Sequence, residues 1–147
     1  MSDIYDPKTF GRRENFGYLV KQVLKELYYA VDRELAPLDM TAAQFSILSH
    51  LVHKELDSAS GLCKGLDYDP GAMTRMIDRL EAKGLLRRVR SREDRRAVDL
   101  ELTAEGEAAF PRMEARVVGV LNRFLKGFSK TEARQLEDML MRMLGNV

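Results

Sequence analysis

The chain is poor in the residues that build covalent crosslinks, metal sites and membrane spans. Its 147 residues include one cysteine, Cys63, so no intramolecular disulfide can form, and no Cys/His cluster has the spacing of a zinc site. The two histidines, His50 and His53, stand three residues apart without a nearby acidic partner, and we expect them at the surface or its boundary rather than on a metal. No apolar run approaches the roughly 18–20 residues of a membrane span. The first residues also lack the apolar core of a signal peptide. We therefore expect a cytoplasmic protein with no cofactor and no membrane contact.

Motifs of enzymes are missing as well. The sequence contains no nucleophile–base motif, no phosphate-binding loop and no metal cluster, so we do not expect an enzyme. What it does contain is 45% apolar and 32% charged residues, a balance typical of a folded globular domain rather than a disordered chain. Its length suffices for one domain with a real core.

The small net charge of +1 conceals a basic centre. Residues 71–99 hold nine Lys/Arg and five Asp/Glu, an excess of +4, so the rest of the chain carries −3. Binding to nucleic acid depends mainly on attraction to phosphates, and a basic segment between acidic ones is therefore a signal for such a partner.

The hydrophobic pattern predicts a mainly α-helical chain with one small β-hairpin. Apolar residues recur at three- and four-residue steps in the helical segments, whereas residues 97–102 alternate strictly, as a half-buried strand does. Thr41 with Gln44 and Ser129 with Glu132 form capping boxes, and Asp69 before Pro70 is a typical helix start. The expected helices span about 14–35, 41–56, 58–65, 71–83, 103–126 and 129–144, and the expected strands span 86–90 and 97–102.

Two short helices followed by a basic hairpin are the parts of a winged helix-turn-helix, which we expect over residues 38–103. The second helix of the pair would enter the major groove with its N-terminus first, where small residues let the backbone come close. Arg75 and Arg79 lie four apart on one face and could reach guanine edges or phosphates. Thr74, and Met73 if its side chain points outward, could touch thymine methyl groups. The residues predicted to contact DNA from the helices are Ser58, Pro70, Gly71, Ala72, Met73, Thr74, Arg75 and Arg79.

The hairpin supplies the second predicted contact, because an arginine at its tip can enter the negative potential of a narrow minor groove. A free carboxylate at Asp94 would repel phosphate, and we expect Asp94 to hold an arginine by a charge-assisted hydrogen bond instead. The predicted wing residues are Arg90, Arg92, Asp94, Arg95 and Arg96.

Each of these two features has a plain alternative. A basic hairpin is often a solvated edge protected from sheet pairing, and a helix with two arginines is usually only a helix. A helical scaffold that binds protein and no DNA would explain the apolar helices, but not the six arginines within residues 87–96. The succession of the two features favours DNA binding.

Three segments point to a known family. Asp94-Arg95-Arg96 followed by Leu102-Thr103 matches a wing signature of the form Asp-x-Arg and then Leu-Thr. Residues 38–45 look like the start of that family's second helix, and residues 71–85 look like its recognition helix and exit. Over about residues 14–144 the chain thus resembles the MarR family of bacterial transcriptional regulators.

The resemblance implies an obligate, triangular homodimer whose first, fifth and sixth helices interleave across a two-fold axis. The apolar stripes of these helices support it independently, because one small domain cannot readily cover them all; an intramolecular bundle is the alternative. Residues 1–37 and 104–147 would form the helical dimerisation region, into which the winged helix-turn-helix is inserted. Such a dimer would read a pseudo-palindrome in double-stranded DNA with half-sites about 10 bp apart.

The family resemblance also implies a repressor, with an activator as the alternative, that a small molecule releases from DNA. The ligand is commonly a phenolic or other aromatic acid, bound where the dimer helices meet the DNA-binding lobe. Sensing of oxidants is not expected, because no cysteine lies near the start of the first helix and Cys63 lies on an apolar helix side. Candidate ligand residues, for each of which taken alone a packing or surface role is the favoured reading, are Arg13, Tyr18, Tyr28, Tyr29, His50 and His53, with Thr74 and Arg88 as a second possibility.

Overall fold

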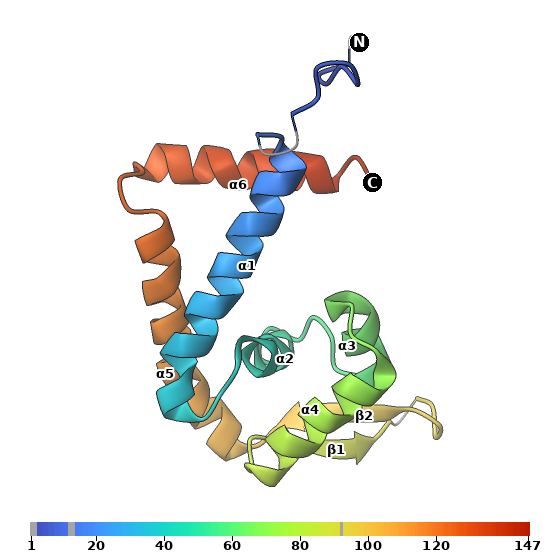
Figure 1. Cartoon of the computed structure of the whole chain (residues 1–147). Coiled ribbons are helices and arrows are strands. Elements are labelled where there is room, and N and C mark those ends of the chain that lie inside the picture. Colours follow the sequence, from blue (N-terminus) through green and yellow to red (C-terminus); the bar gives the residue numbers. More distant parts are fainter. Residues whose placement is uncertain (1–2, 12–13, 92) are drawn as a thin grey trace.

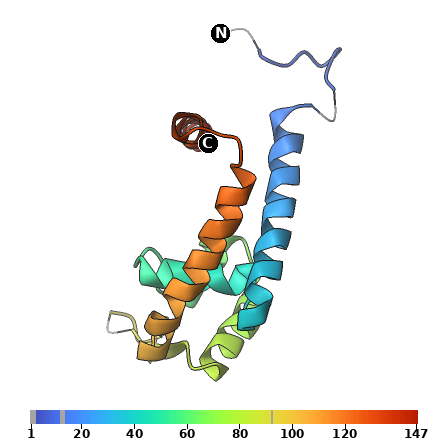
Figure 2. The same cartoon turned by 90° about the vertical axis from the view of Figure 1, so that its left-hand side faces the viewer.

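Two long helices, α1 (Phe16–Leu35) and α5 (Ala104–Phe124), pack side by side in the computed structural model, which describes residues 3–11, 14–91 and 93–147 (Figures 1 and 2). A last helix, α6 (Lys130–Leu144), leaves the end of α5 at a sharp angle. It crosses α1 in Figure 1, but Figure 2 shows the two helices apart. The three helices therefore form an open frame rather than a closed bundle.

The winged helix-turn-helix lies between α1 and α5 in the sequence and at the lower end of both in space (Figure 1). A short 3₁₀ helix, η1 (Ala36–Leu38), leads from α1 into α2 (Ala42–Val52), α3 (Ala59–Leu66) and α4 (Pro70–Ala82). Strands β1 (Leu86–Arg90) and β2 (Val98–Leu102) then form an antiparallel hairpin in which Leu86 pairs with Leu102 and Arg90 with Val98. The prediction of a mainly helical chain with one small hairpin is confirmed.

The helix starts at Thr41, Asp69 and Ser129 follow the capping residues that the sequence predicted. In each of the helices α1 to α6, a side-chain oxygen of the N-cap residue accepts a backbone N–H, and both predicted capping boxes are complete. The helix ends are less well predicted: α2 stops at Val52 because Lys54 adopts a left-handed conformation, and α3 continues through Gly65 to Leu66 before Asp67 does the same. The capping residues are Asn15, Thr41, Ser58, Asp69, Thr103 and Ser129.

The hydrophobic core lies inside the winged helix-turn-helix and between α1 and α5 where these two helices pack together. It contains Val31, Leu35, Ile47, Leu48, Leu62, Met73, Ile77, Leu80, Leu86, Leu100, Phe110, Met113 and Val120. Helix α6, in contrast, contributes no buried residue. Within the described residues, no helix has both the length and the apolar character that crossing a membrane requires.

The start of α5 is hydrogen-bonded directly to the segment between α4 and β1 of the winged helix-turn-helix. The hydroxyl of Thr103 donates to the carbonyl of Gly84 at 2.5 Å, and the backbone N–H of Thr103 donates to the carbonyl of Leu85 at 3.1 Å. At Gly106 the two segments come so close that a Cβ atom would stand 2.0 Å from the Leu85 carbonyl oxygen. Only glycine fits there, and the contact sets the angle at which α5 leaves the winged unit.

Replacing Gly106 by Ala is expected to lower the free energy of unfolding by about 1–3 kcal/mol, because the added methyl group overpacks against backbone that cannot yield. Urea denaturation at fixed protein concentration measures this change. Gly119→Ala on the same helix is the matched control, since a Cβ there meets nothing within 4 Å. It should instead raise stability by up to about 1 kcal/mol. Equal effects of the two substitutions would contradict the close-approach explanation.

Candidate nucleic-acid interface

Helix α4 presents one buried and one exposed face, as a recognition helix must. Asp69 caps it by accepting the N–H of Ala72 at 3.0 Å, and Pro70 occupies its first position. Gly71, Thr74, Arg75 and Arg79 are exposed, whereas Ala72 is half-buried. The exposed face therefore carries two arginines beside small residues, an arrangement that suits entry into a major groove.

The predicted contact of Met73 with DNA is wrong. Its side chain is fully buried beside Ile77 and Leu80, so it cannot reach a thymine methyl group. The i, i+4, i+7 spacing of these three residues places them together on the inner face of the helix. Thr74 stays exposed, and its hydroxyl donates to the Pro70 carbonyl at 2.8 Å.

Ser58 lies where the start of α3 meets strand β2. Its hydroxyl accepts the N–H of Gly61 at 3.0 Å as the cap of α3, and its backbone forms an isolated β-bridge with Asp99 of β2. Ser58 thus links the first helix of the pair to the wing. Its predicted contact with DNA stays a prediction.

Asp94 shapes the loop of the wing through the backbone. Its Oδ1 atom accepts the N–H of Arg96 at 2.9 Å, and its carbonyl accepts the N–H of Ala97 at 3.0 Å. Among the described residues, Asp94 forms no ion pair with a guanidinium, and the hydrogen bond that it does form holds the main chain of Arg96. Its expected hold on an arginine side chain stays a prediction. Arg92, also predicted to contact DNA, lies outside the described residues.

Arg90, Arg95 and Arg96 are exposed on the wing, and within the described residues their side chains form no ion pair. The same holds for Arg75 and Arg79 on α4. Five uncompensated guanidinium groups on α4 and the adjoining hairpin are what binding to phosphates and to groove edges requires.

Arg88, on β1, has a different role. Its guanidinium binds Asp78 at 2.5 Å and Glu81 at 2.7 Å, both on α4, and its backbone N–H donates to Glu81 at 3.0 Å. The hydrogen bond with Asp78 raises the pKa of Arg88, and the contact with Glu81 adds to this effect. Because its donors are engaged, Arg88 is a poor candidate for ligand binding. Instead it locks the hairpin to the recognition helix, a function that the sequence analysis missed although α4 carries two carboxylates one turn apart.

The predicted ligand residues do not converge. Tyr18, Tyr28 and Tyr29 are exposed along α1, while His50 and His53 lie near the end of α2. The expectation that the histidines lack an acidic partner is wrong for His50, whose Nδ1 lies 2.7 Å from a carboxylate oxygen of Glu55. His53 instead packs its ring edge-on against Phe110. Arg13 lies outside the described residues.

Metal ligands do not gather in the described part of the chain: no group of three or more His, Cys, Asp and Glu residues there is placed to hold an ion. The side chains that gather at the interface are basic, and the chemistry they support is binding rather than catalysis.

Comparisons with known proteins agree with this geometry. Residues 38–97 match the model of the MarR family. Over 129 residues the chain is 34% identical to the multiple antibiotic resistance protein MarR of Escherichia coli (strain K12), a match that covers 87% of this chain and 90% of that protein. It is 29% identical over 117 residues to the HTH-type transcriptional repressor MdtR of Bacillus subtilis, covering 80% of this chain and 73% of that protein.

A solved structure extends the likeness to three dimensions. A mutant MarR from E. coli in complex with operator DNA superimposes with a TM-score of 0.76 at 32% identity, covering 87% of this chain and 92% of the other. The predicted winged helix-turn-helix fold and the resemblance stated from the sequence are thereby confirmed.

The role found for Asp94 makes a prediction that separates its charge from its hydrogen bond. Asp94→Asn keeps an oxygen that can accept the Arg96 N–H and removes the negative charge, so duplex DNA should bind equally well or more tightly. Asp94→Ala removes both, and binding should weaken about tenfold because the loop loses a hydrogen bond to a charged acceptor. Fluorescence anisotropy with labelled duplex at constant salt measures both affinities. If the two variants bind alike, the acceptor is not needed.

Proposed function

The chain belongs to the MarR family of transcriptional regulators, and we propose that it acts as a homodimeric, sequence-specific repressor that a small molecule releases from its operator. Its relatives are regulators and not enzymes, so the chain is a DNA-binding regulator rather than an enzyme. The observation that carries the proposal is a set of five exposed arginines on α4 and the wing that form no ion pair within the described residues. Arg88 joins the two elements that carry them.

Each DNA-binding element has its own part in this proposal. Arg75 and Arg79 on α4 read the major groove, with Pro70, Gly71, Ala72 and Thr74 letting the helix approach. Arg95 and Arg96 place the wing in the flanking minor groove, where the potential is most negative. We assign residues 38–103 to this DNA-binding unit and residues 1–37 and 104–147 to dimerisation, in a protein that acts in the cytoplasm.

Unburied apolar side chains support the homodimer. On α1, α5 and α6 they form stripes that no other part of the described chain covers, and Leu24 and Met139 are more than half exposed, at 51% and 55%. A monomer would hold this surface in water, whereas a second copy can cover it with its own matching stripes. The stripes contain Phe16, Leu19, Val20, Val23 and Leu24 on α1, Val118, Leu121 and Phe124 on α5, and Leu136, Met139, Leu140, Met143 and Leu144 on α6.

Release by an effector is proposed as a population shift. A ligand that binds better to a dimer whose two winged units do not match the groove spacing lowers the affinity for the operator. Family resemblance supports repression and an aromatic effector. Activation remains the alternative, and a reporter with the operator placed at its promoter separates the two, because a repressor lowers expression. The DNA-free scaffold is disfavoured by the five free arginines.

Selection of operators from random duplexes tests the DNA-binding proposal. We expect an inverted repeat whose half-sites lie about 10 bp apart. Arg75→Ala should relax the base preference by about 1–3 kcal/mol per lost bidentate contact, whereas Arg96→Ala should weaken binding strongly while the dimer stays intact. Arg112→Ala, an exposed arginine on α5, is the control for lost charge. Enrichment of no motif would contradict sequence-specific binding, and a uniform loss in Arg75→Ala would assign that side chain to phosphate.

The dimer is tested on α6. Leu136→Glu should raise the dimer dissociation constant by about 30-fold or more, because a charge replaces a side chain expected at the centre of the interface. Gln135→Glu adds the same charge to the polar face of the same helix and should change the constant by less than about threefold. Sedimentation equilibrium measures both constants. A Leu136→Glu variant that dimerises like the parent would refute this interface.

A further inference from the structure

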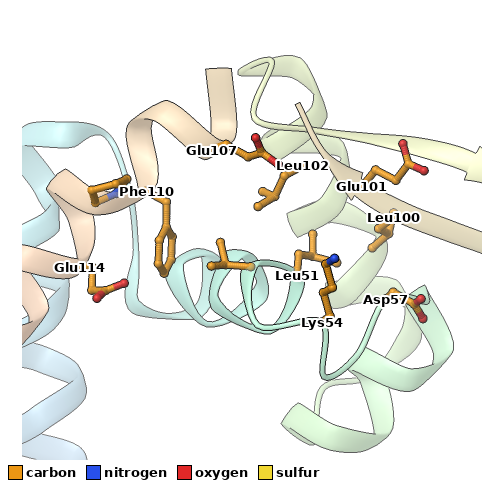
Figure 3. A pocket seen from close by; sticks show the side chains of 11 residues that line it. Leu51, Lys54, Asp57, Leu100, Glu101, Leu102, Glu107, Phe110 and Glu114 are labelled. Carbon is orange, nitrogen blue, oxygen red and sulfur yellow. The ribbon is translucent and has the colours of Figure 1, made fainter. Parts of the chain in front are cut away.

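A cavity of about 700 Å³ opens where α2, β2 and the first half of α5 meet. Figure 3 shows Leu51 of α2, Leu102 of β2 and Phe110 of α5 converging on it. Leu51, Leu100 and Phe110 are buried, and Phe110 is held in place by stacking on Phe45 with ring centroids 5.3 Å apart. The cavity therefore has a preformed apolar floor, which is the usual basis of a small-molecule site.

The rim of this cavity is negatively charged. Asp57, Glu107 and Glu114 are exposed lining residues, and in the described part of the chain their carboxylates form no ion pair. The fourth lining carboxylate, Glu101, is already bound to Arg87 at 2.9 Å. Lys54 contributes the one ammonium group among the lining residues. Three free carboxylates against one free ammonium leave a net charge of −2 on the rim.

An apolar floor under a negative rim selects its ligand by charge. An aromatic carboxylate, the effector class that the family resemblance suggests, would have to place its anion among three carboxylates. A cation of the same shape would bury its rings on Phe110 and Leu51 and keep its charge beside Glu107, Glu114 or Asp57. We propose that this cavity binds a small amphipathic cation, an aromatic or aliphatic amine, and that this ligand is the effector of the regulator.

The walls of the cavity connect it to the DNA-binding unit. The backbone N–H of Leu100 donates to the carbonyl of Asp57 at 2.6 Å, and the next residue, Ser58, bridges to Asp99 and caps α3. Asp99 lies at the start of β2, next to the loop of the wing. The opposite wall is α5, which belongs to the dimerisation region. A ligand wedged between the two walls would therefore tilt the wing and α3 relative to the dimer, a step that rests on the proposed function.

Three probes of nearly equal shape test the charge preference: 1-naphthylmethylammonium, 1-naphthalenemethanol and 1-naphthoate. Isothermal titration calorimetry with the full-length protein should rank their affinities as cation, then alcohol, then anion. The double variant Glu107→Gln/Glu114→Gln should bind the cation about tenfold more weakly and the alcohol unchanged. Glu105→Gln is the matched control. It removes a charge from the same first turn of α5, but its side chain lies against Gly84 instead of lining the cavity, and it should change cation affinity less than about twofold.

The effector role is tested on the selected operator by anisotropy. The cation should weaken operator binding by the parent and by Glu105→Gln, but much less by the double variant, which also controls for direct binding of the probe to DNA. Tighter binding of the naphthoate, or equal cation affinity in all three proteins, would overturn the site. Cation binding at this site without loss of DNA affinity would overturn the effector role alone. Operator binding measured without any probe tests the proposed function separately. If the protein alone does not bind the operator, DNA recognition is refuted, whatever the cavity binds.

Discussion

A single copy of the chain leaves apolar side chains of α1, α5 and α6 in water, and the need to cover them governs how the molecule is organised. Helix α6 buries none of its residues, and the upper part of α1 is exposed along its apolar stripe. Burial of apolar surface is the main source of folding and association free energy, so an open frame of this kind is stable only when another surface closes it. We propose that a second copy of the chain is that surface, and for this reason we place DNA recognition in a dimer.

A dimer can set the distance between its two winged helix-turn-helix units only if each unit is rigidly joined to α1 and α5. Asp32 of α1 accepts the N–H of Ala42 at the start of α2 at 2.7 Å, and Thr103 and Gly106 fasten α5 to the end of the recognition unit. Arg88 then joins the wing to α4. The cavity between β2 and α5 adjoins this joint, so a ligand bound there would act where the winged unit meets the long helices.

Local signals in the sequence predicted most of the fold. Each cap satisfies its own helix, as Thr41 with Gln44 does, and the alternation before Thr103 predicted the second strand to within a residue. Features that depend on contacts between distant segments were missed or misassigned. The partner of Arg88 lies on another element, the partner of Asp94 is a main-chain N–H, and the lining of the cavity comes from three elements. For Met73, helical periodicity indicated the buried face, and only the assignment as a DNA contact was wrong.

We propose that two winged units, fixed in one dimer, read one face of the DNA. A hydroxyl-radical footprint on the selected operator tests it most directly, because it reports which sugars each unit shields. We expect two symmetry-related protected regions whose centres lie about one helical turn apart on the same face, with further protection in the flanking minor grooves where the wings lie. A single protected region, at a protein concentration that saturates the operator, would contradict it.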